Sequence, residues 1–168
     1  NHTGNLAIIN HPQPSDVIFN NDGTKMYTTD SITGGVEEYD LSTAYDLSSF
    51  DPLSSRTFDS TEQIESAVLE GLAFSSDGTK MFLVGGTENT IFSYDLSTAF
   101  LITTATYNES FDLTGEIQEA ASITFNNDGT MMFITDATSG DIESYTMCAY
   151  SLTETPGSCS SESEESEE

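Results

Sequence analysis

Residues 72–82 read LAFSSDGTKMF, and the chain contains this segment in three related copies. The other two copies are VIFNNDGTKMY at residues 17–27 and ITFNNDGTMMF at residues 123–133. Asp77 follows Asp22 by 55 positions, and Asp128 follows Asp77 by 51 positions. Self-similarity at a nearly constant spacing is typical of repeat architectures, in which each copy forms one structural unit. We therefore expect three copies of one unit.

The spacing continues downstream of each copy. The segment YDLSTA at residues 39–44 recurs unchanged at residues 94–99, and a diverged third copy, YTMCAY, follows at residues 145–150. Each unit alternates runs of β-branched and aromatic residues with Gly, Asp and Ser, which predicts short strands joined by turns. The expected strands are 16–20, 24–30, 35–41 and 55–59 in the first unit, 71–75, 79–85, 90–96 and 104–111 in the second, and 121–126, 130–136 and 141–147 in the third.

Four-stranded units of this length are typical of β-propeller blades. We predict an all-β fold with blades at 14–60, 67–112 and 119–150, forming a partial propeller or half of a closed ring. The third blade lacks a fourth strand, because the matching stretch is the acidic tail at 151–168, which we expect to be disordered or a linker. A β-sandwich is the alternative, but it would not explain the fixed recurrence.

The turns Asp22-Gly23, Asp77-Gly78 and Asp128-Gly129 indicate hairpins between the first and second strands of each blade. Glycine accepts a positive φ, and the Asp side chain accepts hydrogen bonds from nearby backbone amides. We expect these Asp residues to be structural rather than ligands. The fixed register of the tyrosines and methionines assigns them to the core: Tyr39, Tyr94, Tyr145, Met26, Met81 and Met132.

The charge balance is strongly acidic, with 29 Asp and Glu residues against three Lys and Arg residues, and a formal net charge of −26. Such a surface repels nucleic acid and anionic lipid headgroups, which argues against both as partners. It attracts cations or basic partners, although acidity that serves only solubility is an equal alternative. No apolar run approaches the roughly 18 residues of a membrane span.

Several features favour an extracellular or cell-surface setting. Cys148 and Cys159 lie close enough in sequence for a disulfide in an oxidising compartment, with two free thiols as the alternative. Asn1 and Asn108 each begin a glycosylation sequon. The chain does not begin with Met, so we expect a piece of a longer or processed product.

Three blades are too few to close a ring, because propellers usually close with about four to eight. We expect self-association, or a neighbouring part of a longer chain, to complete the blades. The N-terminal segment 1–13 contains the apolar run Leu6–Ile9, which we interpret as a strand that latches one chain to another. Reciprocal exchange of this strand would give a closed dimer, and head-to-tail exchange would give a filament.

The segments FSSDGTKMFLVG at residues 74–85 and IFSYDLST at residues 91–98 resemble YVTN-type β-propeller repeats, which look similar to lactonase-like propellers. The resemblance covers about residues 14–150. It implies a propeller fold and, because such repeats are often found in surface-layer proteins, an extracellular role. The longer repeat, Met131 in place of Lys, and the diverged YTMCAY segment depart from the pattern.

The loop between the second and third strands is the most variable part of each unit, and loops at one mouth of a propeller commonly bind ligands. Asp30, Glu88 and Asp136 lie in these loops as candidate calcium ligands, because hard cations prefer oxygen. Ordinary polar turns are the alternative. Catalysis has little support, because His2 and His11 precede the repeats and the chain has no nucleophile elbow, zinc motif or phosphate loop.

The sequence therefore predicts a non-enzymatic extracellular propeller module for protein–protein interaction, adhesion or surface assembly. A calcium- or glycan-binding propeller of lectin type is the second interpretation. A degenerate lactonase-like hydrolase is the third. No cofactor is expected apart from calcium in the second interpretation.

Overall fold

The computed structural model describes residues 12–51, 53–66 and 68–152. They form three antiparallel sheets, each a simple meander in chain order. The predicted all-β fold is confirmed, and the predicted strands match the observed ones to within a few residues. The strands are β1 Pro14–Phe19, β2 Lys25–Asp30, β3 Gly35–Asp40 and β4 Arg56–Asp59; β5 Leu69–Phe74, β6 Lys80–Gly85, β7 Thr90–Leu96 and β8 Ala105–Asp112; β9 Ala120–Phe125, β10 Met131–Asp136 and β11 Ile142–Thr146.

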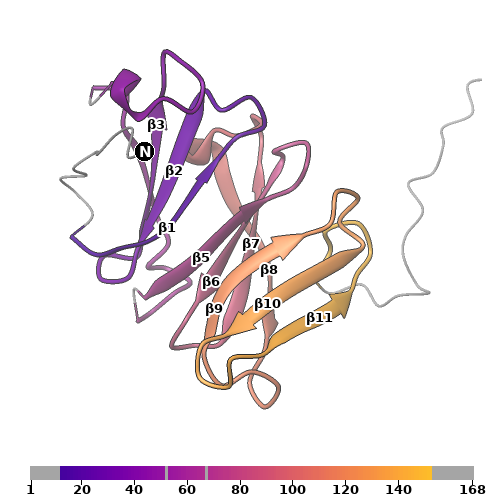
Figure 1. The fold of residues 1–168 in the computed structure, drawn as a ribbon. Coiled ribbons are helices and arrows are strands. Elements are labelled where there is room, and N and C mark those ends of the chain that lie inside the picture. The colour runs from indigo at the N-terminus through magenta and orange to yellow at the C-terminus, as the bar shows by residue number, and fades with distance from the viewer. Residues whose placement is uncertain (1–11, 52, 67, 153–168) are drawn as a thin grey trace, which may run out of the picture.

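The sheets stand side by side as blades, with the second blade between the first and the third (Figure 1). The first strands β1, β5 and β9 are neighbours, as expected for the inner strands of a propeller. Among the described residues the third sheet has only three strands, as the sequence predicts. The fixed recurrence therefore reflects repeated blades, and the sandwich alternative is wrong.

Apolar side chains of alternate strand positions fill the two spaces between blades. Tyr27 and Val36 of the first blade pack with Met81 and Leu83 of the second. On the opposite face of the second blade, Phe82 and its neighbours pack with the third blade. The central blade is thus buried on both faces, which explains why its second strand is apolar at consecutive positions.

The three Asp-Gly turns share a second feature that the sequence did not predict. In each turn, an aromatic ring lies against the glycine: Tyr45 against Gly23, and Phe100 against Gly78. The backbone N–H of Phe100 donates to the carbonyl of Gly78 at 2.9 Å. Both partners have positive φ, +59° for Phe100 and +74° for Gly78. The turn and the segment after the third strand are therefore held together at one end of each blade.

The Asp of each turn is structural, as predicted. Asp77 Oδ1 accepts hydrogen bonds from the backbone N–H and the hydroxyl of Thr79, at 2.9 and 2.8 Å. The hydroxyl of Ser75 also donates to Asp77 Oδ1, at 2.6 Å. The Ser75 bond and the two Thr79 bonds lower the pKa of Asp77, because they stabilise the charged carboxylate. Asp22 and Asp128 make the equivalent bonds to the threonines two residues later.

A buried carboxylate joins the first blade to the second. Glu38 is fully buried on β3, and its Oε2 accepts the N–H of Ile102 at 3.0 Å. Ile102 begins η2, a short 3₁₀ helix at Ile102–Thr104. Lys25 and Arg56 neutralise the other carboxylate oxygen of Glu38 and also bind Asp40. Two of the three cationic side chains in the whole sequence are therefore used at one joint.

The contact between the second and third blades also uses a carboxylate that accepts a backbone N–H, but this carboxylate comes from a different strand. Ser93 occupies the position of Glu38 in the second blade, and its register partner is Glu109 on β8. Glu109 Oε1 accepts the N–H of Leu152 in the third blade at 2.7 Å. The carboxylate therefore lies on the third strand of the first blade and on the fourth strand of the second blade, and it makes the inter-blade hydrogen bond in both. A pattern based on aligned positions alone would miss this equivalence.

Replacing Gly78 with alanine tests the ring contact at the turn. A Cβ at this position would lie 2.3 Å from the Phe100 ring, in addition to the strain of a positive φ. Gly140 is the matched control, because it has a similar φ of +77° and nothing within 4 Å of the added Cβ. We expect G140A to cost roughly 1–2 kcal/mol and G78A to cost about 1–3 kcal/mol more. Urea denaturation measures both, and equal losses would contradict the contact.

Candidate functional site

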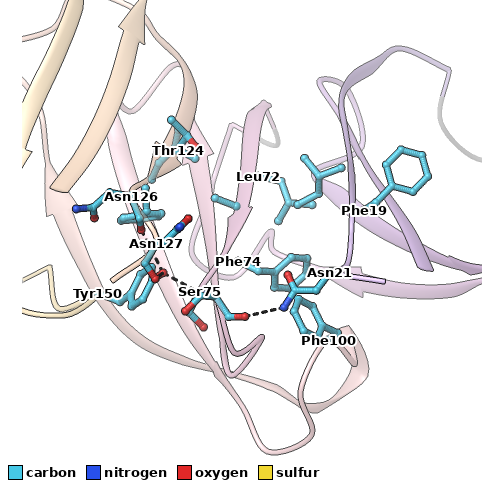
Figure 2. Close-up of a pocket in the computed structure, with 15 residues that line it drawn as sticks. Phe19, Asn21, Leu72, Phe74, Ser75, Phe100, Thr124, Asn126, Asn127 and Tyr150 are labelled. Atoms are coloured by element: carbon cyan, nitrogen blue, oxygen red, sulfur yellow. Dashed lines mark hydrogen bonds between the residues drawn. The ribbon is translucent and has the colours of Figure 1, made fainter. Parts of the chain in front are cut away.

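A pocket of about 310 Å³ lies where the three inner strands end and their hairpin turns begin (Figure 2). All three blades contribute to it through β1, β5, β9 and the turns that follow them. Phe100 and Tyr150, which follow the third strands of their blades, complete the wall. The pocket is a junction of repeated elements, so each blade presents an equivalent segment to it. Concave sites where several elements meet are the usual places for ligands.

The lining combines aromatic rings with amides and hydroxyls. The polar lining residues include Asn21, Asn126, Asn127, Ser75, Ser76 and Thr124. The side chains of Asn126 and Ser75 make hydrogen bonds within their own hairpins. None of the lining residues is Asp, Glu, His, Lys or Arg. In a chain with a net charge of −26, a pocket without any of these side chains is a distinct chemical environment. The lining residues are Ile18, Phe19, Asn21, Leu72, Ala73, Phe74, Ser75, Ser76, Phe100, Ile123, Thr124, Phe125, Asn126, Asn127 and Tyr150.

A line of hydrogen bonds connects the three turns across the pocket. The amide of Asn21 donates to the carbonyl of Ser76 at 2.7 Å, joining the first blade to the second (Figure 2). The N–H of Ser76 donates to the hydroxyl of Tyr150 at 3.1 Å, joining the second blade to the third. Tyr150 in turn donates to the carbonyl of Asn127 at 3.1 Å. The pocket is therefore held by polar contacts as well as by core packing.

Tyr150 is the third aromatic residue of the set that lies against the turn glycines, with its ring on Gly129. Sequence reasoning missed this set. Tyr45 and Phe100 lie six positions after the repeated Tyr39 and Tyr94, whereas Tyr150 lies five after its equivalent. The third blade reaches the same arrangement with two consecutive positive φ values, at Ala149 and Tyr150. An alignment allowing one deletion would have revealed the signal.

The candidate calcium ligands belong to three different blades: Asp30 and Asp136 end β2 and β10, and Glu88 lies in the loop after β6. The described structure does not bring them together into a metal-binding cluster. Asp136 accepts hydrogen bonds from four backbone N–H groups, those of Gln118, Glu119, Thr138 and Ser139. These bonds, above all the one from Gln118, lower its pKa to about 2. Its side chain therefore fastens two loops to each other.

Asp30 plays the same part in the first blade, where it accepts from the N–H groups of Gln13, Ile32 and Thr33. Glu88 accepts from the N–H and hydroxyl of Ser66, at 2.8 and 2.9 Å. No cluster of three or more His, Cys, Asp or Glu side chains able to hold a metal occurs within the described residues. Calcium binding by Asp30, Glu88 and Asp136 stays a prediction.

The other predicted sites fall partly outside the described residues. Asn1, Cys159, His2 and His11, together with the apolar run Leu6–Ile9, lie outside them. Asn108 is exposed on β8, at a register shift where Glu109 and Tyr107 pair with consecutive residues of β7. Cys148 is bonded in a disulfide. The described residues contain no helix long and apolar enough to cross a membrane.

The chain is similar to known propeller structures. No protein-family model matches the sequence, and no curated protein matches it. A β-propeller domain of Cps50 (Swd1) from Myceliophteria thermophila superposes with a TM-score of 0.56 at 11% identity, over 80% of this chain and 40% of that one. The fold is therefore a partial propeller, as the sequence predicted.

Two similar structures carry lactonase names. A Bacteroides fragilis protein, provisionally named a 6-phosphogluconolactonase, superposes with a TM-score of 0.60 at 14% identity, over 79% of this chain and 34% of that one. The periplasmic gluconolactonase of Pseudomonas aeruginosa gives 0.57 at 18% identity, over 83% and 37%. The chain thus spans little more than a third of these lactonase-like proteins, and identities this low show the fold alone.

These neighbours correct one prediction. The sequence led us to expect a non-enzymatic chain, because no catalytic motif was visible. The matching folds include proteins named as lactonases. The expectation of a non-enzymatic chain, drawn from the missing motif, is therefore wrong. The physical reason is that propeller sites are assembled from loops of several blades, so their residues share no short sequence motif.

The pH dependence of stability tests the role of Asp136. Its folded pKa of about 2 lies below the 3.8 that is usual for Asp, so the stability that it contributes is present above pH 3.8 and is lost as the pH falls towards 2. We expect D136N to be less stable than the wild type at neutral pH and to lose less stability in this acidic range. D141N, an exposed change in the same loop, should keep the wild-type profile. Thermal unfolding at several pH values measures this, and parallel profiles for D136N and wild type would contradict it.

Proposed function

We propose that this chain is a lactonase-like propeller unit that binds a neutral polyhydroxylated ring, a sugar or sugar lactone, in the pocket between its inner strands. The observation that carries the proposal is the composition of the lining. It combines aromatic residues with Asn, Ser, Thr and Tyr, and none of its residues is Asp, Glu, His, Lys or Arg.

The chemistry of such a ring fits this lining. The C–H faces of a sugar are apolar and pack on aromatic side chains such as Phe74 and Phe100, while its hydroxyls need both donors and acceptors. The amides of Asn21 and Asn127 provide both, and Tyr150 adds a hydroxyl already oriented by its bonds to the turns. The mixture of apolar wall and few directed polar groups is typical of small-molecule sites.

The absence of a cation from the lining favours a neutral ligand over a phosphorylated one. Phosphate recognition usually relies on Arg or Lys, and the chain has only three such residues. Lys25 and Arg56 are engaged with Glu38 and Asp40, and Lys80 with Asp95. None of them lines the pocket.

Ring opening of a bound lactone is the second candidate function, favoured by the names of the two lactonase-like neighbours. Hydrolysis requires a base that activates water and a donor that stabilises the oxyanion. The described lining supplies amide donors and no carboxylate or imidazole. The lining by itself supports binding, and acid release from glucono-lactone, followed at constant pH, tests turnover separately.

We further propose an extracellular setting, because the YVTN-type resemblance and the sequon at Asn108 both favour it. The disulfide at Cys148 supports the same setting, because disulfides persist in oxidising compartments. One of the neighbours is named as periplasmic. Adhesion or surface assembly of the propeller is compatible with this setting and stays a prediction.

Removing the Tyr150 hydroxyl tests the pocket. Y150F keeps the ring against Gly129 and removes a polar contact at the wall, so we expect affinity for a sugar or a stable sugar lactam to fall about fivefold to tenfold, the effect of one hydrogen bond. Y45F is the matched control, because Tyr45 lies on the equivalent glycine outside the pocket. Isothermal titration calorimetry measures both variants. Equal affinity of Y150F and wild type, or no binding by the wild type, would refute the site.

A further inference from the structure

The third blade presents a strand edge that is covered in the other two blades. In the described structure β11 pairs only with β10 (Figure 1). The equivalent strands β3 and β7 each lie between two neighbours, with β4 and β8 on their outer side. An exposed edge offers a row of backbone donors and acceptors to another strand.

Ile142 shows what this edge lacks. Its equivalents, Val36 and Ile91, have no exposed surface, and they lie directly opposite Phe58 and Phe111 of the outer strands. Ile142 is 69% exposed. The repeat thus places an apolar residue on the third strand to meet an aromatic residue on the fourth, and in the third blade that apolar residue faces solvent.

The two outer strands that exist share a short pattern. They read Thr57-Phe58-Asp59 and Ser110-Phe111-Asp112. In each, the phenylalanine ring reaches the following blade, where Phe58 contacts Tyr94 at 5.0 Å and Phe111 contacts Tyr145 at 5.5 Å between ring centroids. In both complete blades, the strand that covers the edge of the third strand therefore carries a Ser or Thr followed by Phe.

The face of the third blade that points away from the second has lost its charges. In the first and second blades Lys25 pairs with Asp40, and Lys80 with Asp95. In the third blade Met131 and Thr146 occupy these positions and contact each other at 3.8 Å. Both members of the ion pair are replaced together. The outward side chains of β10 and β11 are Met131, Phe133, Thr135, Ile142, Ser144 and Thr146.

The opposite end of the array is already closed by the chain itself. Tyr39 is the first-blade equivalent of Tyr94, and Phe50 contacts it at 4.9 Å between ring centroids. Phe50 pairs with Leu41, whereas Ala105 pairs with Leu96 at the equivalent position of the second blade. The larger side chain of Phe50 takes the place beside Tyr39 that Phe58 takes beside Tyr94. A second copy docking its third blade there would meet an occupied site.

We propose that the free edge of β11 is an acceptor site for an extended strand of a partner polypeptide, with the chemistry Ser or Thr, then Phe, then a neutral or basic residue. The strand pairs antiparallel to β11, as β8 pairs with β7, and its Phe lies opposite Ile142. The residue after Phe differs from the Asp of β4 and β8, because it would face Asp141 where those strands face Gly35 and Thr90. The acidic character of the whole chain favours the same choice.

Fluorescence anisotropy with labelled peptides tests the proposal on the full chain. The first peptide copies residues 105–112, and the second carries D112K. A third carries F111A and D112K. We expect the D112K peptide to bind most tightly and the F111A change to weaken binding about tenfold or more, as for an aromatic residue buried at an interface. Equal affinity of the second and third peptides, or no binding by either, would overturn the proposal.

Variants of the chain locate the binding to β11. I142S removes the apolar contact at an exposed position, so we expect weaker peptide binding with an unchanged unfolding midpoint. I32S is the matched control, because Ile32 is 58% exposed and lies in the loop between β2 and β3. I32S should bind as the wild type does, and an identical effect of the two changes would overturn the site. The chain could also self-associate through this edge. If I142S abolished that self-association and the peptide did not compete with it, the edge would bind a second copy, and the proposal would be overturned.

Discussion

A propeller blade has two apolar faces, and it buries each of them only by packing against another sheet. The second blade satisfies this condition with its two neighbours, and its second strand is apolar on both sides. The first blade covers its outer face with its own loop, through Phe50 and Leu47. Within the described residues, the third blade leaves Ile142 and the edge of β11 uncovered. The side-by-side order of the blades and the proposed docking edge both follow from this unequal coverage.

The joints between blades depend on carboxylates that accept backbone N–H groups of the next blade. Glu38 and Glu109 make this bond from different strands, to Ile102 and Leu152. A buried carboxylate needs compensation, which Lys25 and Arg56 provide at the first joint. This use of scarce cations leaves the pocket free of positive charge, and so the joints influence which ligands the pocket can accept.

Much of the fold could be predicted from the sequence, because hairpin turns and strand periodicity are local signals. The segment around Gly78 and its two related copies predicted one blade each. The methionines Met26, Met81 and Met132 are buried, as expected. The pocket could not be predicted, since its residues come from three turns that are far apart in sequence. Tyr150 was hidden by a deletion of one residue, and the equivalence of Glu38 and Glu109 depends on strand register. Phe50 takes the place that Ala105 has in the second blade, and its packing on Tyr39 becomes visible only when the blades are compared in space.

Native-state hydrogen exchange of the β11 amides, compared with those of β3 and β7, tests the unequal coverage of the blades most directly. The amide protons of β3 and β7 lie between two paired strands, so we predict strong protection there. The amide protons of β11 that point away from β10 should exchange almost as fast as in an unfolded chain. Protection of these β11 amides equal to that of β7 would contradict the account, because it would show that the third blade is already covered.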